Sequence, residues 1–311
     1  MGEYVKSVAM TAISLRSPGR VSKRRSRAVR TGPLLAPAVG LLLAWMIVPL
    51  ALTLWFSVQY YNLLDPLNAG FAGLDNYRYL ITDDGLLEAI FRTLILLGAV
   101  LALSIVFGVF FALIFDAEFP GRGIARLLTI APFFVMPTVS ALIWKNLLMH
   151  PVNGLFAYLA KLFGLNPIDW FVQIPMTSII LIVAWQWIPF ATLILMTAMQ
   201  SLDREQMEAA RLDGAKGVAT FIHIILPHLL RPISVVVMIE TIYLLAVFAE
   251  IQVTTTGGPG TATTTLTYFI YNKALLQWDI GAASAGGVVA IILANIVAAF
   301  LIRTLARNLD S

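Results

Sequence analysis

The chain has 311 residues, of which 59% are hydrophobic and only 12% charged, with a formal net charge of +4. Soluble domains are about 45–50% apolar and about 25% charged, so this composition excludes an ordinary soluble enzyme and a disordered chain. The absence of cysteine excludes disulfide scaffolds, thiolate metal sites and cysteine nucleophiles, and three histidines argue against a histidine-rich metal centre.

Six segments are long and apolar enough to cross a bilayer, which takes about 20 residues because the hydrocarbon core is about 30 Å thick. They are residues 34–58, 93–115, 127–148, 177–199, 233–249 and 285–305. The length of the first segment, with no cleavage site after it, favours a signal anchor over a cleaved signal peptide. We therefore predict an all-α polytopic membrane protein with six transmembrane helices.

Lysine and arginine are unevenly distributed between the loops. Residues 1–33 contain eight of them and a single acidic residue, Glu3. With this end in the cytoplasm, the inner segments together carry sixteen basic residues and the outer segments five, as the positive-inside rule requires. We expect both termini to be cytoplasmic, with residues 1–33 as a basic arm and 34–311 as the membrane domain. Nucleic-acid binding by the arm is the less favoured reading beside a membrane span.

Prolines and outer loops interrupt the helical pattern. Three spans contain proline, which kinks a helix by removing a backbone hydrogen bond; such kinks occur in transporters and channels but also in plain bundles. In the outer loop 149–175, leucines and phenylalanines at helical spacing predict a short interfacial helix. A Gly-Gly-Pro turn follows the fifth span, and residues 266–276 are predicted to form another short helix.

The inner loop 201–227 has the most specific pattern in the chain. Asp203 is a suitable helix cap, and Gly214 lies where a helix ends in a left-handed residue. A second short helix over 218–225 is expected to stop at Pro227. Ala209 and Ala210 leave a smooth surface for close approach. This helix-turn-helix fits a docking element or, equally, a capped surface helix.

The same loop carries a resemblance to a known family. Glu208-Ala209-Ala210, Gly214, and then Ile224, Leu226 and Pro227 match the pattern E-A-A-x(3)-G-x(9)-I-x-L-P. This is the signature loop of permease subunits in bacterial binding-protein-dependent ABC importers, which the chain resembles beyond about residue 33. The turn 256–259 resembles the maltose-type, carbohydrate-uptake branch. Residues 133–146 and 248–255 resemble its sugar-alcohol permeases, such as those for mannitol and sorbitol.

The resemblance implies an inner-membrane subunit with several partners: a second homologous permease, two ATPase subunits and an extracytoplasmic substrate-binding protein. The cargo would be a carbohydrate, a sugar alcohol or a monosaccharide. In the family the signature loop sits in a cleft on the ATPase, whose closure would move the permeases from inward-open to outward-open as rigid bodies. The implied docking residues are Glu208, Ala209, Ala210, Asp213, Gly214, Ile224, Leu226 and Pro227.

The chain is not expected to be an enzyme. It contains no G-x-x-x-x-G-K-[ST], H-E-x-x-H, G-x-S-x-G or G-x-G-x-x-G motif. ATP hydrolysis is expected in the partner subunits, and no catalytic residue, cofactor, metal or nucleic-acid partner is predicted.

Polar residues within the spans are the candidate substrate ligands, because such residues mark pathways or pair between helices. A polyol offers hydroxyls and no charge, so carboxylate, amide and flat aromatic groups suit it. The predicted substrate-binding residues are Glu250, Gln186, Trp187, Tyr243, Glu240 and Asn146. For Glu250 the alternative is pairing between subunits, and for Glu240 it is a hydrogen bond to Tyr243 or to a neighbouring helix.

Two other classes of membrane protein are alternatives to an importer subunit. A self-contained secondary transporter of a small polar solute is the main alternative, but such folds often show internal repeats, and the two halves show no convincing similarity. A membrane-embedded enzyme lacks a visible catalytic constellation.

Overall fold

The computed structural model describes residues 32–309, and the side chains of 35–303 other than those of Arg204 and Arg211. The chain separates into two units, residues 1–48 and 49–311. The described part of the first unit is the beginning of α1 (Gly32–Ser57). The predicted basic arm lies outside the described residues up to residue 31.

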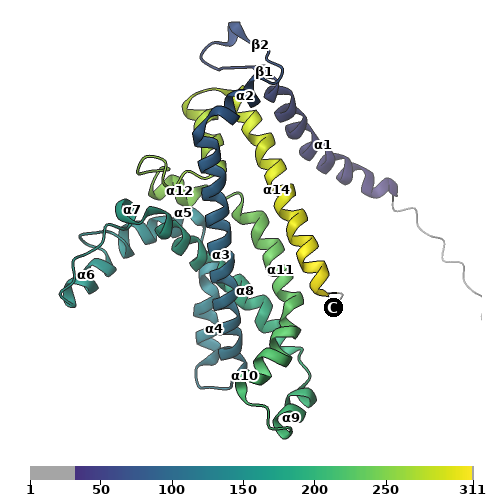
Figure 1. Ribbon diagram of the computed structural model, residues 1–311, viewed down its shortest axis with the longest axis vertical. Coiled ribbons are helices and arrows are strands. Elements are labelled where there is room, and N and C mark those ends of the chain that lie inside the picture. The colour runs from purple at the N-terminus through teal and green to yellow at the C-terminus, as the bar shows by residue number, and fades with distance from the viewer. Residues whose placement is uncertain (1–31, 310–311) are drawn as a thin grey trace, which may run out of the picture. The chain divides into compact units, whose positions relative to one another are not determined.

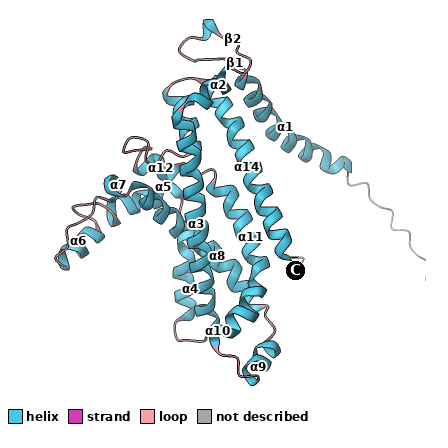
Figure 2. Cartoon of the chain, in the orientation of Figure 1, coloured by secondary structure: helices cyan, strands magenta, loops and turns pink. Residues whose placement is uncertain are grey.

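The described residues are mainly helical (Figures 1 and 2). After α1 come β1 (Gln59–Tyr60), a 3₁₀ turn at Pro66–Asn68 and β2 (Gly70–Phe71), which pairs antiparallel with β1. The helices that follow are α2 (Asp75–Thr82), α3 (Asp84–Asp116), α4 (Arg122–Ile130), η2 (Ala131–Phe134), α5 (Pro137–Ile143), η3 (Trp144–Leu148), α6 (Leu155–Leu162), α7 (Trp170–Gln173), α8 (Pro175–Gln200), α9 (Arg204–Leu212), α10 (Gly217–Thr220), η4 (Phe221–Ile225), α11 (Leu226–Leu244), α12 (Ala249–Thr254), α13 (Leu266–Tyr271), η5 (Asn272–Leu276) and α14 (Ile280–Leu309).

Five of these helices satisfy the length and composition of a membrane span. They cover Leu35–Ser57, Asp84–Asp116, Pro175–Gln200, Gly217–Leu244 and Ile280–Arg303. Each contains or overlaps a predicted span, and the bent pair α4–η2 and α5–η3 supplies the sixth if it is counted as one. The polytopic all-α class predicted from the sequence is therefore confirmed.

The prediction of one helix over 127–148 was wrong. Arg122–Phe134 and Pro137–Leu148 meet at 109°. Between them Val135 and Met136 are extended, with ψ values of 129° and 139°. The ring of Pro137 disfavours the helical conformation in the residue before it, so the chain straightens at Met136.

The prediction that a short helix stops at Pro227 was also wrong. The chain continues from α10 through the π turn η4 into α11, and the whole stretch Gly217–Leu244 is one candidate span. Pro227 falls in the first turn of α11, where a missing N–H is tolerated. Since α11 ends at Leu244, Glu250 belongs to the separate short helix α12 and not to the fifth span.

The predicted short helices in the outer loops are confirmed. Residues 155–162 form α6, in which Leu155 and Leu162 are exposed and Ala157 is buried. Residues 266–276 form α13 followed by the π turn η5. Thr265 caps α13 by accepting from the backbone N–H of Tyr268.

Hydrogen bonds join the segments at the two ends of α3. At the end where α3 begins, Asn76 of α2 donates to the carbonyls of Ser57 and Gln59, at 2.9 Å each. The backbone N–H of Ile280 donates to Tyr61 at 2.9 Å, which places the start of α14 at the same end. At the opposite end Arg126 of α4 donates to the carbonyl of Phe115 at 2.5 Å.

The core runs along the contact between α3 and α8. Its upper cluster includes Leu96 and Val100 of α3 against Ile179 and Val183 of α8. Nearer the end of α3, a β-carbon added at Gly108 would lie 2.8 Å from the β-carbon of Ala191. Glycine at this position therefore permits the close approach of the two helices.

Candidate docking loop and substrate path

The first helix of the signature loop and the glycine turn that ends it form as the sequence predicts. The Asp203 side chain accepts from the backbone N–H of Glu205 at 2.9 Å and caps α9. Gly214 has φ of +79°, in the left-handed region. The backbone N–H of Ala215 then donates to the carbonyl of Ala210 at 2.9 Å, which closes the helix end.

One face of the loop is anchored to the core. Met207 and Phe221 pack against a buried cluster that joins α3, α8 and α11 and includes Ala112, Leu195 and Leu229. The loop is therefore packed onto the membrane helices, because Met207 and Phe221 share a core with them.

The other face of the loop is exposed. Among the predicted docking residues, Glu208, Ala209, Asp213, Gly214 and Pro227 are exposed, whereas Ala210, Ile224 and Leu226 are half-buried. Sequence reasoning missed two further residues beside the glycine turn, Leu212 at 89% exposed and Val218 at 72%. The signal for them was an apolar residue on each side of a turn in a polar loop. An apolar patch of this kind beside the exposed carboxylate of Glu208 suits contact with a protein.

Arginine and histidine side chains hydrogen-bond to backbone carbonyls at the helix ends around this loop. Besides the bond of Arg126, Arg122 donates to the carbonyls of Asp116 and Ala117 at 3.4 and 3.3 Å. His228 of α11 contacts the carbonyl of Ala198 at 3.0 Å through Nε2. A carbonyl only accepts, so Nε2 carries the hydrogen. The ends of α3 and α8 are thereby held to the segments that follow them.

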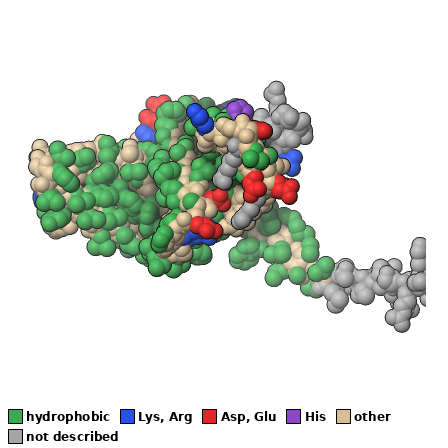
Figure 3. Space-filling view, turned by 90° about the horizontal axis from the view of Figure 1, so that it is seen from below, with side chains coloured by type: hydrophobic (Ala, Val, Ile, Leu, Met, Phe, Trp, Pro, Cys, Tyr) green, Lys and Arg blue, Asp and Glu red, His purple; other side chains and the backbone are tan. Residues whose placement is uncertain are grey.

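A polar cavity of about 860 Å³ lies beside Glu208. It is lined by Asp116, Glu118, Arg122, Met199, Gln200, Leu202, Met207 and Glu208. Charged side chains gather at this end of the molecule in the view from below (Figure 3). Polar side chains of this cavity therefore lie next to the exposed face of the loop.

An aromatic group lies where the broken span meets α8 and α11. The rings of Trp187 and Tyr243 are 5.1 Å apart, and Phe133 and Phe190 lie 5.9 Å from Trp187. Tyr243 is 59% exposed, and Phe134, beside Phe133, is 78% exposed. The sequence predicted Trp187 and Tyr243 but missed the phenylalanines, for which two adjacent aromatics just before a proline break were the available signal.

Gln186 joins this aromatic group to the bend. Its Nε2 donates to the carbonyl of Val135 at 3.0 Å. Its Oε1 is buried and has no hydrogen-bond partner among the described residues. The structure thus brings together three of the six predicted substrate residues: Gln186, Trp187 and Tyr243.

The remaining predicted substrate residues lie in different surroundings. Glu240 is 0% exposed and Glu250 only 5%. Asn146 is exposed, within the π turn η3. Its neighbour Lys145 donates to the carbonyls of Val253 and Thr254 at 2.9 Å, which binds the broken span to the end of α12. Both carboxylates are therefore buried, as is the side chain of Gln186 at 6% exposed.

Comparisons with known proteins agree on the class. Residues 19–311 match the family described as binding-protein-dependent transport system inner membrane component. A probable ABC transporter permease of Sinorhizobium fredii is 34% identical over 93% of this chain and 95% of its own length. The trehalose/maltose transport permease MalF of Thermococcus litoralis is 31% identical over 90% and 94% of the two chains.

A glycerol phosphate transporter and a solved structure extend these matches. The sn-glycerol-3-phosphate permease UgpA of Yersinia enterocolitica is 32% identical over 84% of this chain and 88% of its own. The crystal structure of a bacterial alginate ABC transporter, in complex with its alginate-bound periplasmic protein, has a chain that matches with a TM-score of 0.75. It is 21% identical and covers 89% of this chain and 93% of its own. That likeness shows the fold.

The chain belongs to the family of inner-membrane components of binding-protein-dependent transport systems. It is accordingly a multi-pass permease subunit of an ABC importer and not a catalytic enzyme.

Proposed function

We propose that this subunit carries a carbohydrate across the inner membrane, with a sugar alcohol or a monosaccharide as the preferred cargo. The observation that supports this most directly is the aromatic group, in which half-buried Trp187 lies beside exposed Tyr243, next to a Gln186 oxygen that has no partner among the described residues. Aromatic faces suit the C–H faces of a sugar, and an amide oxygen accepts from its hydroxyls. The similarity to trehalose/maltose and glycerol phosphate permeases supports the same class.

The proposed transporter contains a second, homologous permease, two ATPase subunits and an extracytoplasmic binding protein. We assign ATPase docking to the loop 201–227, with Glu208, Ala209, Leu212 and Val218 on the contact face. Because the loop packs on the core of α3, α8 and α11, a movement of the ATPase surface is transmitted to these helices as a rigid body. A self-contained secondary transporter is not favoured, because the family is that of a binding-protein-dependent system.

Replacement of Trp187 by alanine tests the substrate path. We expect uptake in proteoliposomes that contain the complete transporter to fall roughly three- to tenfold, the loss of about 0.5–1.5 kcal/mol from ring contacts. Basal ATPase activity should persist, because the docking loop is unchanged. Trp187→Phe should restore most of the uptake.

A matched control and a competition series complete the test. Phe110, an aromatic side chain on α3 that is 52% exposed and outside the group, should tolerate alanine. Mannitol, sorbitol, glucose and maltose as competitors of uptake would rank the cargo. Wild-type uptake by Trp187→Ala across the substrate range would remove the aromatic group from the path, and competition by maltose alone would refute the preference for polyols.

A further inference from the structure

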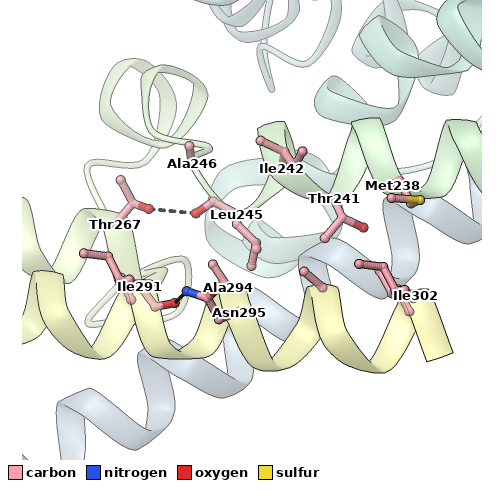
Figure 4. A pocket seen from close by; sticks show the side chains of 13 residues that line it. Met238, Thr241, Ile242, Leu245, Ala246, Thr267, Ile291, Ala294, Asn295 and Ile302 are labelled. Atoms are coloured by element: carbon pink, nitrogen blue, oxygen red, sulfur yellow. Dashed lines mark hydrogen bonds between the residues drawn. The ribbon is translucent and has the colours of Figure 1, made fainter. Parts of the chain in front are cut away.

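Glu240 is a carboxyl group that neither the docking loop nor the aromatic group uses. It lies on α11, is 0% exposed, and both of its oxygens are buried without a hydrogen-bond partner among the described residues. Val236, Glu240 and Leu244 follow one another at steps of four, so they share one face of the helix, and all three are buried. Another side of α11, with Met238 and Ile242, is exposed and lines a groove of about 470 Å³ against α14 (Figure 4). The carboxyl therefore belongs to the packed side of the helix.

Ser104 of α3 is the polar side chain that interacts with this carboxyl. It is also fully buried, and its hydroxyl makes no hydrogen bond of good geometry within the described part of the chain. The helices α3 and α11 contact each other. Two buried polar groups on packed helices are costly unless they bond to one another. Glu240 and Ser104 are therefore best understood as one polar pair across the α3–α11 contact.

Apolar clusters lie on both sides of this pair. Toward the start of α3, Val100 belongs to the same buried cluster as Leu244 of α11. Toward the end of α3, Ala112 belongs to a second cluster with Leu229 of α11. On both helices the polar pair falls between these positions. Apolar side chains thus separate it from the two ends of the helices.

Glu240 forms no ion pair among the described residues, and the elements packed against α11 bring no cation near it. The helix α8 contains no ionisable residue. Those of the other elements are Asp84, Glu88, Arg92 and Asp116 on α3, Arg303 and Arg307 on α14, His223 on η4, and His228, Arg231 and Tyr243 on α11 itself. Along their helices, Arg231 is about 14 Å from Glu240 and Arg92 about 18 Å from Ser104, at about 1.5 Å per residue.

Complete burial without a counter-charge decides the protonation state. This chain alone covers the carboxyl, so no partner subunit and no lipid reaches it in this conformation. An ionised carboxylate costs far more in such a place than the neutral acid does. The neutral acid also has an O–H to donate, and the hydroxyl oxygen of Ser104 can accept it.

We propose that Glu240 carries a proton and donates a hydrogen bond to Ser104, and that this neutral link fixes the register of α11 against α3. A hydrogen bond is directional, whereas the apolar contacts on either side are not, so the link specifies one arrangement of the two helices. Three residues after Glu240, Tyr243 packs its ring on Trp187 at 5.1 Å. Glu240 is accordingly a positioning residue for the aromatic group, and this last step rests on the proposed function.

Infrared spectra of the complete transporter in proteoliposomes at pH 7 test the protonation. A protonated carboxyl has a carbonyl band that is well separated from the bands of ionised carboxylates. Glu240→Gln should remove such a band, which in the wild type should shift only slowly in heavy water. The matched control is Glu118→Gln, at an exposed position between α3 and α4, which should change only the bands of ionised carboxylates. If Glu240→Gln does the same as this control, the proposal is overturned and the proposed function is unaffected.

Uptake of radiolabelled mannitol and maltose tests the positioning role. Glu240→Leu keeps an apolar side chain of similar size but cannot donate, so uptake should fall roughly two- to tenfold, as for the loss of one hydrogen bond. The thermal midpoint of the complex should stay the same or rise, because an apolar side chain suits a buried site. Glu240→Gln is neutral and keeps a donor, so it should restore most of the uptake. A group that serves stability alone predicts the reverse, a lower midpoint with unchanged uptake.

A double-mutant cycle tests whether Ser104 is the partner. Ser104→Ala should lower uptake to about the same extent as Glu240→Leu, and the double variant should fall no further, because both changes break the same bond. The matched control is Ser234→Ala. Ser234 is a buried serine of α11 whose hydroxyl donates to the carbonyl of Leu230 at 2.8 Å, and its replacement should leave uptake at the wild-type level.

Two results of these uptake measurements would contradict the link: additive losses in the double variant, or equal damage by Glu240→Gln and Glu240→Leu. A wild-type transporter that takes up no sugar or polyol would instead refute the proposed function. The infrared band would still decide the protonation of Glu240 in that case, because it is measured without transport.

Discussion

Lys273 shows how one buried cation can join three segments. Its ammonium lies 2.9 Å from Asp83 and 3.0 Å from the hydroxyl of Tyr79, and its side chain is 6% exposed. The same nitrogen lies 4.8 Å from the centre of the Tyr79 ring. Burial lowers the pKa of Lys273, but the hydrogen bonds and the charge of Asp83 outweigh it, so the pKa is raised above its usual value. The π turn η5 is thereby fixed to α2 and α3.

Replacement of Lys273 by methionine should destabilise the transporter by about 3 kcal/mol, because it leaves Asp83 without its counter-charge. The thermal midpoint in detergent measures this loss. Lys273→Met combined with Asp83→Asn should recover part of it, since the amide oxygen can still accept from the N–H of Gly85.

The pH dependence of stability tests the same ion pair. A lysine whose pKa is raised in the folded state stabilises the fold at every pH below its unfolded pKa of about 10.4. We therefore expect the difference between wild type and Lys273→Met to be constant from pH 6 to about 9 and to shrink only above that. A difference that vanished near neutral pH would contradict the pairing.

At single residues, the sequence predicted the chemical type of the side chains at the candidate site well, but it predicted poorly which of these side chains are buried. Trp187 and Tyr243 were chosen as flat apolar surfaces and do lie together, at 5.1 Å between rings. Glu250 follows an apolar stretch, but α11 ends six residues before it, and in α12 the carboxylate is buried. Whether a side chain faces a path depends on where its helix ends, and that is decided by packing. Substrate binding by Glu250 stays a prediction, which wild-type uptake by Glu250→Gln would remove.

Among the helices, the signature loop was predictable because its signals are local. A capping aspartate, an alanine pair and a glycine specify α9 and its end without help from the rest of the chain. The bent span was harder, because its composition is that of an ordinary span. Only the pair Met136–Pro137 indicates the break. Continuity through Pro227 could not be predicted, since it depends on the π turn η4.

Gly214→Val tests the loop as an element. Among the described residues, a β-carbon at Gly214 would meet no atom within 4 Å, so the cost of substitution comes from the backbone, at φ of +79°. A β-branched residue in this region is strained by about 1–3 kcal/mol. We expect Gly214→Val to insert in the membrane normally but to copurify little ATPase and to lose uptake.

Gly214→Asn is the matched control, because asparagine tolerates the left-handed conformation. It should keep both ATPase binding and uptake near wild type. If Gly214→Val and Gly214→Asn lose ATPase binding to the same extent, the loss does not come from the turn conformation and must be assigned to the added side chain.

On the scale of the whole molecule, the unequal coverage of the helices is that expected of one subunit of a larger assembly. Its best-covered candidate span, α8, lies against α3 along the core, whereas only 11% of the most apolar 18-residue window of α14 is buried. The sequence alone supplies the number of spans and their polarity, because both follow from composition. It does not supply which faces stay uncovered, since coverage depends on long-range contacts within and between chains.

The predicted orientation can be measured directly, because the chain has no cysteine of its own. Single cysteines at Leu67, which is 95% exposed, and at Asn166 lie in the predicted outer loops. Cysteines at Glu118 and Lys216 lie in the predicted inner loops and are also exposed positions. In intact spheroplasts an impermeant maleimide should label the first pair and spare the second. After the membrane is opened with detergent, all four should react, which controls for access within the fold. The basic residues of the inner loops are held back from translocation, and this is the physical reason for the expected pattern. Labelling of Lys216→Cys from outside would reverse the orientation, and the ATPase-docking role of the loop would fall with it, because ATP and its hydrolysing subunits are on the cytoplasmic side.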